Sequence, residues 1–400
     1  RAASRRGRAV ARRRCGEDQC GACGRRPPVD LEGNVLAWQS LAERLSTAVV
    51  TEELLGRARR AFGLREGQSL WLHQLLTTAF PHLATKNAAR QAQRRGHVQV
   101  DGAPVTACAW APPAGAVLQV RSGRVDQLDP GLAERAAAWN LGRGGREENR
   151  LAVLRSCPDE GWAVVNKPAG LHTTPDGPAN KKLTLHSYLP ALLPPPASGD
   201  YCPRPLPCHR LDFWVSGPVV VATATDALRS ISTAFEERLV QKEYRAVVCG
   251  RVGAAGDVFT IDAPVGGKES QTEVEVLQTA DCPHCGALSE LALRPLQGRF
   301  HQLRLHCVEA MGAPIVNEDG GIYARAEFAW RRRHGTPLPP RVHRGVGGLF
   351  LQAVAVTFPR PGRRGEAASV RAPAAERFGA LMRQSQGAWD YCHRGTTPRQ

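Results

Sequence analysis

The sequence lacks any apolar run of the roughly 18–20 residues that a helix needs to cross a bilayer. The apolar stretch at residues 188–197 is broken by prolines. This absence argues against a membrane protein. Hydrophobic residues nevertheless make up 42% of the chain, which is enough to build a sizeable core. For 400 residues, the usual domain size of about 150 residues predicts two or three globular domains.

Two nucleotide-binding signatures are absent as well. Neither G-x-G-x-x-G nor G-x-x-x-x-G-K-[ST] occurs, so the sequence supports neither a dinucleotide-binding fold nor a P-loop NTPase. Several strand-like segments alternate with few helical ones. This pattern favours an α+β fold with a mixed, mostly antiparallel sheet.

The twelve cysteines lack the compact, even spacing of a disulfide framework. This scattered spacing favours reduced thiols in an intracellular protein. The pairs Cys20–Cys23 and Cys282–Cys285 each have the spacing of half a zinc knuckle, but no second half follows nearby in the sequence. We therefore expect no metal, with zinc at these pairs as the alternative.

Acidic residues are absent from the first fifteen positions, which contain seven arginines. This composition is typical of a transit peptide for a mitochondrion or chloroplast. A basic arm that touches nucleic acid, in a cytoplasmic or nuclear protein, is the alternative. The rest of the chain is basic too, because the formal net charge of the whole chain, +16, is larger than the charge of these seven arginines. This excess favours a polyanionic partner.

Composition and pattern divide the chain into five parts. Residues 1–66 are a basic N-terminal segment, and residues 67–122 form a small module of helix and strand. A Gly/Arg-rich linker over 123–150 leads to the main body at 151–362. The last part, 363–400, is expected to be a C-terminal helix and tail.

The sequence of the small module, residues 67–122, predicts two helices followed by a hairpin. Thr85 is placed to cap the second helix, which ends before Gly96, and the segment HVQVDG then alternates like a strand closing in an Asp-Gly turn. One edge of this second helix is basic and suits a phosphate backbone. The edge consists of Lys86, Arg90, Arg94 and Arg95. With these features the stretch resembles the S4 RNA-binding domain.

Four motifs follow in the main body. They are VVNKPAGL at 164–171, HRLDxxxSG at 209–217, KEYRAVVCG at 242–250, and GRFHQLRLH with GAPIVNED between 298 and 319. In their order and spacing they resemble the RluA-type family of RNA pseudouridine synthases, and the likeness extends over residues 67–361. It implies that family's α+β catalytic fold behind an S4-like domain, an RNA partner, no cofactor and a monomer.

The resemblance also implies roles for five residues. Asp212 is the catalytic carboxylate, acting either as nucleophile at C1′ of the ribose or as base for the 2′ proton. Arg304 pairs with Asp212 and keeps it ionised and oriented. Tyr244 packs against the target base and is placed to help the late proton step at C5. Arg210 enters the space left by the flipped nucleotide, and His301 supports the RNA-binding site.

Three departures from the family pattern stand out. Phe213-Trp214-Val215 replace residues that are usually polar, and Gln352 stands where a histidine is common. Because glutamine can still donate and accept hydrogen bonds, we expect this change to be tolerated. The insert 324–347 carries Arg331–Arg333, which could track RNA.

The expected substrate is ribosomal RNA, with transfer RNA as the second candidate. Two other functions compete with the synthase. A non-catalytic RNA-binding protein could keep the fold as a scaffold, although the intact Asp, Tyr and Arg set argues against it. An RNA N-glycosidase would share the bond-breaking step but would release the base.

Overall fold

The computed structural model describes residues 30–42, 45–80, 83, 85–94, 96–121, 131–141, 147–175, 184–196, 201–318, 320–337 and 348–393. The arginine-rich opening with its transit-peptide signal, the Cys20–Cys23 pair and Arg95 lie outside these ranges. Within them, no helix combines the length and the apolar content that crossing a membrane requires.

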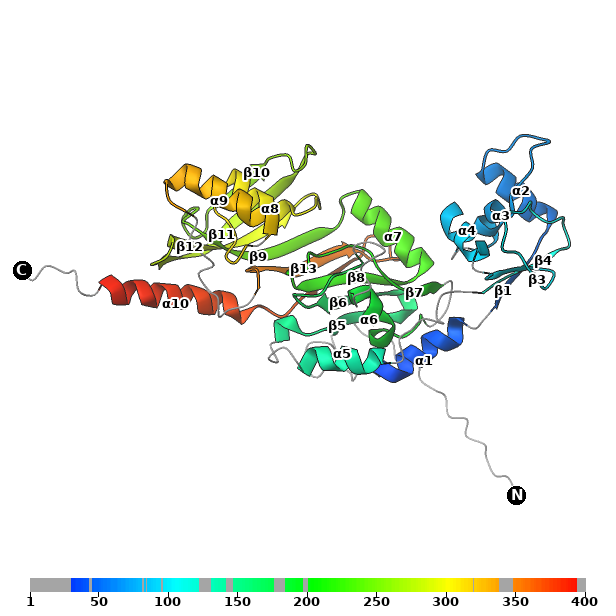
Figure 1. The fold of residues 1–400 in the computed structure, drawn as a ribbon, viewed down its shortest axis with the longest axis horizontal. Helices are drawn as coiled ribbons and strands as arrows, with labels where there is room; N and C mark the ends of the chain where they lie inside the picture. Colours follow the sequence, from blue (N-terminus) through cyan, green and yellow to red (C-terminus); the bar gives the residue numbers. More distant parts are fainter. Residues whose placement is uncertain are drawn as a thin grey trace, which may run out of the picture.

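A small N-terminal unit, blue to cyan in Figure 1, contains three helices and a four-stranded antiparallel sheet in the order β1-β4-β2-β3. Its elements are β1 (Leu45–Val49), α2 (Glu52–Ala61), α3 (Leu72–Ala79), α4 (Lys86–Arg94), β2 (Val98–Val100), β3 (Ala103–Pro104) and β4 (Val117–Arg121). The unit begins before the expected residue 67. Strand β1 pairs with β4, and Leu54 and Ala58 of α2 share the core with Leu75 and Leu76 of α3.

The local signals in this unit are confirmed. Thr85 caps α4, because its Oγ1 accepts a hydrogen bond of 3.1 Å from the backbone N–H of Ala88. Gly96 ends the helix with a φ of 72°, a left-handed value that glycine adopts without strain. Asp101 and Gly102 have φ values of 49° and 78° and form the turn between β2 and β3.

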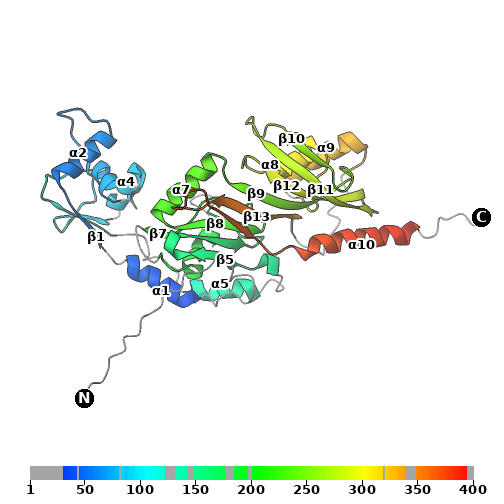
Figure 2. The same cartoon turned by 180° about the vertical axis from the view of Figure 1, so that it is seen from behind.

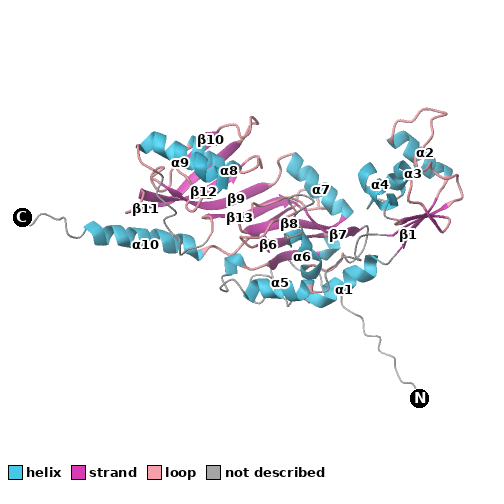
Figure 3. Cartoon of the chain, in the orientation of Figure 1, coloured by secondary structure: helices cyan, strands magenta, loops and turns pink. Residues whose placement is uncertain are grey.

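The main body is built on two antiparallel sheets, so the expected α+β class is confirmed (Figure 3). One sheet has the order β5-β6-β8-β7, and the other has the order β10-β11-β12-β9-β13-β14. The first comprises β5 (Ala152–Cys157), β6 (Trp162–Lys167), β7 (Tyr201–Pro207) and β8 (Gly217–Ala224). The second comprises β9 (Gln241–Cys249), β10 (Val258–Asp262), β11 (Gln271–Cys282), β12 (Gly286–Pro295), β13 (Leu351–Pro359) and β14 (Ala367–Arg371).

Helices surround these sheets (Figures 1 and 2). Helices α1 and α5 contact α6, α7 contacts β8, and α10 contacts β11. Short turns of 3-10 helix precede β5 and β6, at Glu147–Asn149 and Pro158–Glu160. The bounds of the helices are α1 (Leu31–Ala42), α5 (Leu132–Leu141), α6 (Leu185–Leu192), α7 (Thr225–Glu236), α8 (Gln302–Leu305), a π-helical turn (His306–Ala310), α9 (Gly320–His334) and α10 (Glu376–His393).

Three segments assigned elsewhere from the sequence thus pack on the main body. Helix α1 comes from the expected N-terminal segment, yet the indole N–H of its buried Trp38 donates to the carbonyl of Leu193 at 2.7 Å. Helix α5 comes from the expected linker and contacts α6. Strand β14 lies beyond residue 362 and pairs with β13. Burial of apolar side chains explains all three shifts, because Val35 of α1, Leu132 of α5 and Val370 of β14 lie in the apolar cores of the main body.

The backbone determines where two helices begin. Helix α7 follows β8 directly, so its cap falls on Ala224, and Asp226 pairs with Arg229 at 3.1 Å within the first turn. Helix α8 begins at Gln302, directly after His301 with its left-handed φ of 57°.

The two sheets meet where the Ser-Gly pair of the second motif reaches β13. Ser216 forms a bridge with Gln352, and its carbonyl accepts the N–H of Ala353 at 2.9 Å. Gly217 has a φ of 134°, and a Cβ atom there would lie 2.2 Å from the carbonyl oxygen of Ala353. Because Ala353 also pairs with Tyr244 of β9, this contact brings the loop before β8 to the middle of the larger sheet.

We expect Gly217→Ala to lower the free energy of unfolding by about 2–5 kcal/mol, because it combines a strained φ with a backbone clash. Gly256→Ala is the matched control: its φ of 93° is also left-handed, but nothing lies within 4 Å of the added Cβ. The control should lose only about 1–2 kcal/mol. Urea unfolding of both variants measures the difference. Equal losses would show that the approach to β13 carries no cost.

Candidate active site

Asp212 lies in the loop between β7 and β8, with its side chain 22% exposed. The neighbouring residue Leu211 is buried, and its carbonyl and N–H both bond to the hydroxyl of Thr173, at 2.9 and 3.1 Å. On the other side, the carbonyl of Phe213 accepts the N–H of Gly170 at 2.7 Å. The segment after β6 therefore holds the loop on both sides of the carboxylate.

Two cationic or potentially cationic side chains face this carboxylate. A terminal nitrogen of Arg304 and Nε2 of His301 each lie 3.6 Å from Oδ2 of Asp212. The two residues are three positions apart and face the same carboxylate. The left-handed backbone at His301 places its ring beside Asp212.

Arg304 has a second carboxylate partner that the sequence reasoning did not identify. Its Nε donates to Oε1 of Glu318 at 2.9 Å, and a terminal nitrogen contacts the same oxygen. The side chains are only 7% and 1% exposed. Glu318 follows Asn317, which adopts a left-handed φ of 62° and donates its side-chain amide to the carbonyl of Gly348. The buried guanidinium thus lies between Asp212 and Glu318, and its orientation is fixed.

Tyr244 lies on β9, opposite Leu293 of β12 and Ala353 of β13. Burial raises the pKa of its phenol, and the negative charge of Asp212 raises this pKa further. The hydroxyl therefore stays protonated at neutral pH. The structure brings Asp212, Arg304, His301 and Tyr244 together from three separate segments of the chain.

Lys167 is a further residue with a structural part in the site. It is fully buried, and its ammonium donates to the carbonyls of Pro168 at 3.0 Å, Leu171 at 2.8 Å and Phe213 at 3.4 Å. Burial lowers the pKa of Lys167 to about 7, while the charge of Asp212 acts in the opposite direction. Its bond to Phe213 ties β6 to the loop of Asp212. The Asn-Lys-Pro motif was the sequence signal for this contact.

The unusual residues after Asp212 are accommodated by aromatic packing. The ring of Phe213 lies 4.5 Å from His172 and 4.6 Å from Trp214, and Trp214 packs against the main core. Gln352 is buried and, as expected, both donates and accepts. Its amide N–H donates to Pro373 at 2.9 Å, and its oxygen accepts the N–H of Ala375 at 3.0 Å.

Arg210 lies at the edge of this cluster, and the other described candidate residues lie on α4 and α9. Arg210 is exposed, with its guanidinium 5.9 Å from the ring of Phe300. Lys86, Arg90 and Arg94 are exposed along α4 of the small unit. On α9, Arg331 pairs with Glu327 at 3.0 Å, Arg333 donates to the carbonyl of Met311, and Arg332 is exposed; the rest of this insert, beyond residue 337, lies outside the described residues.

Cys282 is buried and Cys285 half-buried, and both are free thiols. A hydrogen bond with Cys285, followed by burial, raises the pKa of the Cys282 thiol. A hydrogen bond with Cys249, and burial as well, raise the pKa of the Cys285 thiol. Among the residues that the structure describes, no three His, Cys, Asp or Glu side chains are grouped so that they could hold a metal ion.

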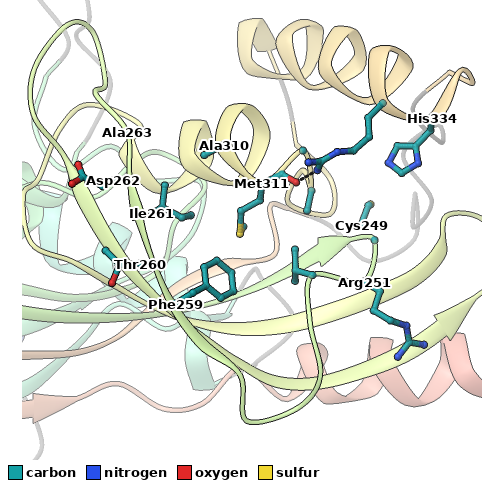
Figure 4. Close-up of a pocket in the computed structure, with 15 residues that line it drawn as sticks. Cys249, Arg251, Phe259, Thr260, Ile261, Asp262, Ala263, Ala310, Met311 and His334 are labelled. Atoms are coloured by element: carbon teal, nitrogen blue, oxygen red, sulfur yellow. Dashed lines mark hydrogen bonds between the residues drawn. The ribbon is translucent and has the colours of Figure 1, made fainter.

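A pocket of about 650 Å³ lies apart from Asp212, between the end of β9, β10, the π-helical turn and α9 (Figure 4). Phe259 and Met311 face each other across it, and Arg251 and His334 lie at its edge (Figure 4). Asp212, Tyr244, His301 and Arg304 do not line this pocket, so it is separate from the cluster around Asp212.

The sequence is similar to known proteins in the region of this cluster. Residues 161–309 match the family described as RNA pseudouridylate synthase. The "Dual-specificity RNA pseudouridine synthase RluA" of Yersinia pestis is 34% identical over 42% of this chain and 81% of its own. The protein of the same name from Escherichia coli K12 is 30% identical over 57% and 95%. The solved structure "Human RNA Pseudouridylate Synthase Domain Containing 1" is 24% identical, covering 57% of this chain and 85% of its own, with a TM-score of 0.40.

We expect Glu318→Gln to lower the free energy of unfolding by about 3 kcal/mol, because it removes the buried one of the two charged partners of the Arg304 guanidinium. Glu290→Gln is the matched control. Glu290 is also buried and pairs with Arg245 at 3.1 Å, but Arg245 is 43% exposed and remains solvated when the charge is removed. Glu290→Gln should lower the free energy of unfolding by only about 1 kcal/mol. Chemical denaturation compares the two, and a larger loss for Glu290→Gln would contradict this account of Arg304.

Proposed function

The chain belongs to the RluA-type family of RNA pseudouridine synthases, and from that premise we propose that Asp212 is its catalytic carboxylate. The enzyme converts uridine in RNA to pseudouridine. The observation that carries the assignment is the position of the Asp212 carboxylate, 3.6 Å from both Arg304 and His301. Its partly exposed side chain is accessible to a ribose that enters the site.

The reaction breaks the bond between N1 and C1′ and forms a bond between C5 and C1′. N1 ends with a proton and C5 loses one, so the product has the mass of the substrate. A carboxylate can serve this exchange as nucleophile at C1′ or as base for the 2′ proton. Uridine deuterated at C2′ distinguishes them, because only removal of that proton gives a primary isotope effect.

The neighbouring residues support this chemistry in different ways. Arg304 attracts the negative charge of Asp212 and holds its carboxylate in one orientation, since Glu318 fixes the guanidinium from the other side. The raised pKa of Tyr244 keeps its hydroxyl protonated. A protonated hydroxyl cannot remove the C5 proton directly. We therefore favour a role in which the Tyr244 ring packs against the uracil or its hydroxyl donates a hydrogen bond to the uracil. Arg210 fills the space of the flipped nucleotide.

The exposed edge of α4 is proposed to bind the RNA backbone. Lys86, Arg90 and Arg94 recur every four residues, so their charges lie along one side of the helix. The S4-like pattern of helix, strand and Asp-Gly turn supports this role. Ribosomal RNA is the first candidate substrate and transfer RNA the second. Because all the site residues come from one chain, a monomer suffices.

We expect Asp212→Asn to abolish pseudouridine formation, by about a thousandfold or more, because the amide is nearly isosteric but is neither nucleophilic nor basic. RNA affinity should stay within a few-fold. The measurement is chemical mapping of pseudouridine, with the mass of the RNA checked for base loss. Turnover by the pure variant would refute the assignment. A wild-type product that has lost uracil would favour the glycosidase, and no turnover would favour the scaffold protein.

Replacing Lys86, Arg90 and Arg94 together by alanine should weaken RNA binding without loss of chemistry. The plot of log affinity against log salt should flatten by about 0.7–0.9 units for each phosphate that the variant no longer neutralises. The rate at saturating RNA should stay near the wild-type value while KM rises, the pattern of weakened ground-state binding. The control removes the same charge from exposed positions of the same unit, by alanine at Arg57, Arg60 and Arg65. Equal salt slopes for the two triple variants would contradict the role of α4.

A further inference from the structure

Phe300 is a large aromatic side chain beside the site that is 66% exposed. Single exposed apolar residues are common and need no explanation by themselves. This ring is distinguished by its surroundings. It stacks on the imidazole of His301, with centroids 3.7 Å apart and planes at 24°, and the guanidinium of Arg210 lies 5.9 Å from its centre. His301 in turn is 3.6 Å from Asp212.

The backbone holds this stack in place. His301 has a φ of 57°, a left-handed conformation that costs a residue with a side chain about 1–3 kcal/mol and persists only when its surroundings enforce it. Here Gln302 enforces it. Its side-chain oxygen accepts the N–H of Arg299 at 3.0 Å, and its amide donates to Gln271 of β11 at 2.9 Å. The exposed ring is therefore presented by a fixed segment.

A cation lies beside the ring, because the exposed Arg210 places its guanidinium 5.9 Å from the ring centre. Two further basic residues bond to backbone in neighbouring segments: Arg299 donates to the carbonyl of Glu269 at 3.1 Å, and Lys242 to that of Gln297 at 3.4 Å. The carboxylate of Glu269 is itself paired with Arg238 at 3.7 Å. An accessible aromatic ring beside a cation is the combination by which proteins bind unpaired nucleotides: the ring stacks on a base, and the cation attracts the backbone.

We propose that Phe300 is a stacking platform for an unpaired base that neighbours the uridine entering the Asp212 site. The ligand class is a single-stranded segment of RNA, and the interaction reads the flat face of the base rather than its edges, so it tolerates any sequence. The position of the stacked base relative to the reacting uridine rests on the proposed function, whereas the ability of Phe300 to stack on a base does not depend on it.

Affinity for two defined probes tests the platform. One is a twelve-nucleotide oligouridylate, and the other is an abasic ribose-phosphate strand of the same length. Binding is measured by fluorescence anisotropy with the full chain carrying alanine at Lys86, Arg90 and Arg94, so that the edge of α4 does not mask the effect. Phe300→Ala is compared with Phe300→Tyr. The control is Phe328→Ala, because Phe328 of α9 is 70% exposed and lies in another segment.

Phe300→Ala should weaken binding of the oligouridylate by about five- to a hundredfold, the value of one base stacked on an aromatic ring. Its affinity for the abasic strand should not change. Phe300→Tyr should bind both probes within about twofold of its parent, because the ring is retained. Phe328→Ala should leave both affinities unchanged.

Two results would overturn the proposal. The first is that Phe300→Ala changes the affinity for both probes equally, or changes neither affinity. The second is that Phe328→Ala weakens binding of the oligouridylate, but not of the abasic strand, as much as Phe300→Ala does. Neither outcome depends on turnover, since the affinities can be measured with Asp212→Asn. A failure of pseudouridine formation in the wild type would instead refute the catalytic proposal, and would leave a base-dependent loss at Phe300 standing.

Discussion

The close contact between the Ser216-Gly217 pair and Ala353 determines how the site is assembled. The loop of Asp212 belongs to one sheet and Tyr244 to the other, and Gln352 and Ala353 of β13 touch both segments. A side chain at position 217 would collide with a backbone oxygen, which no change of neighbouring side chain can remove. The distance between carboxylate and phenol therefore depends on the absence of a single Cβ atom.

Charge balance is the second constraint on the cluster. A guanidinium removed from water is costly unless it is paired and hydrogen-bonded. Arg304 has Glu318 as a buried partner and Asp212 as a half-buried one. This leaves Asp212 accessible while its partner cation is held rigidly. The buried amine of Lys167, whose pKa is lowered to about 7, adds positive charge near the carboxylate in its protonated form and bonds to the backbone that carries Asp212. The arrangement keeps a negative charge stable at the edge of an apolar core.

The sequence predicted the parts of this molecule that local chemistry determines. Thr85 as a cap, the end of α4 at Gly96 and the Asp101-Gly102 turn all followed from short-range rules. The features that the sequence did not predict depend on contacts between residues that are far apart in the chain. Glu318 is one of several acids in its segment, and only the fold shows that it meets Arg304. Helix α1 lies far from its partner α6 in the sequence, so its docking left no local trace.

The pairing of β9 with β13 has a consequence for how the protein is made. Tyr244 and its partner Ala353 are separated by β10, β11, β12 and α9, and the buried amide of Gln352 finds its partners only at Pro373 and Ala375. During synthesis at about 5–20 residues per second, β9 must therefore wait many seconds on the ribosome with one edge uncovered. Such long-range pairings fold slowly, and they expose strand edges to other nascent chains in the meantime. The order of strands in the larger sheet thus makes the half-synthesised chain a natural client for chaperones.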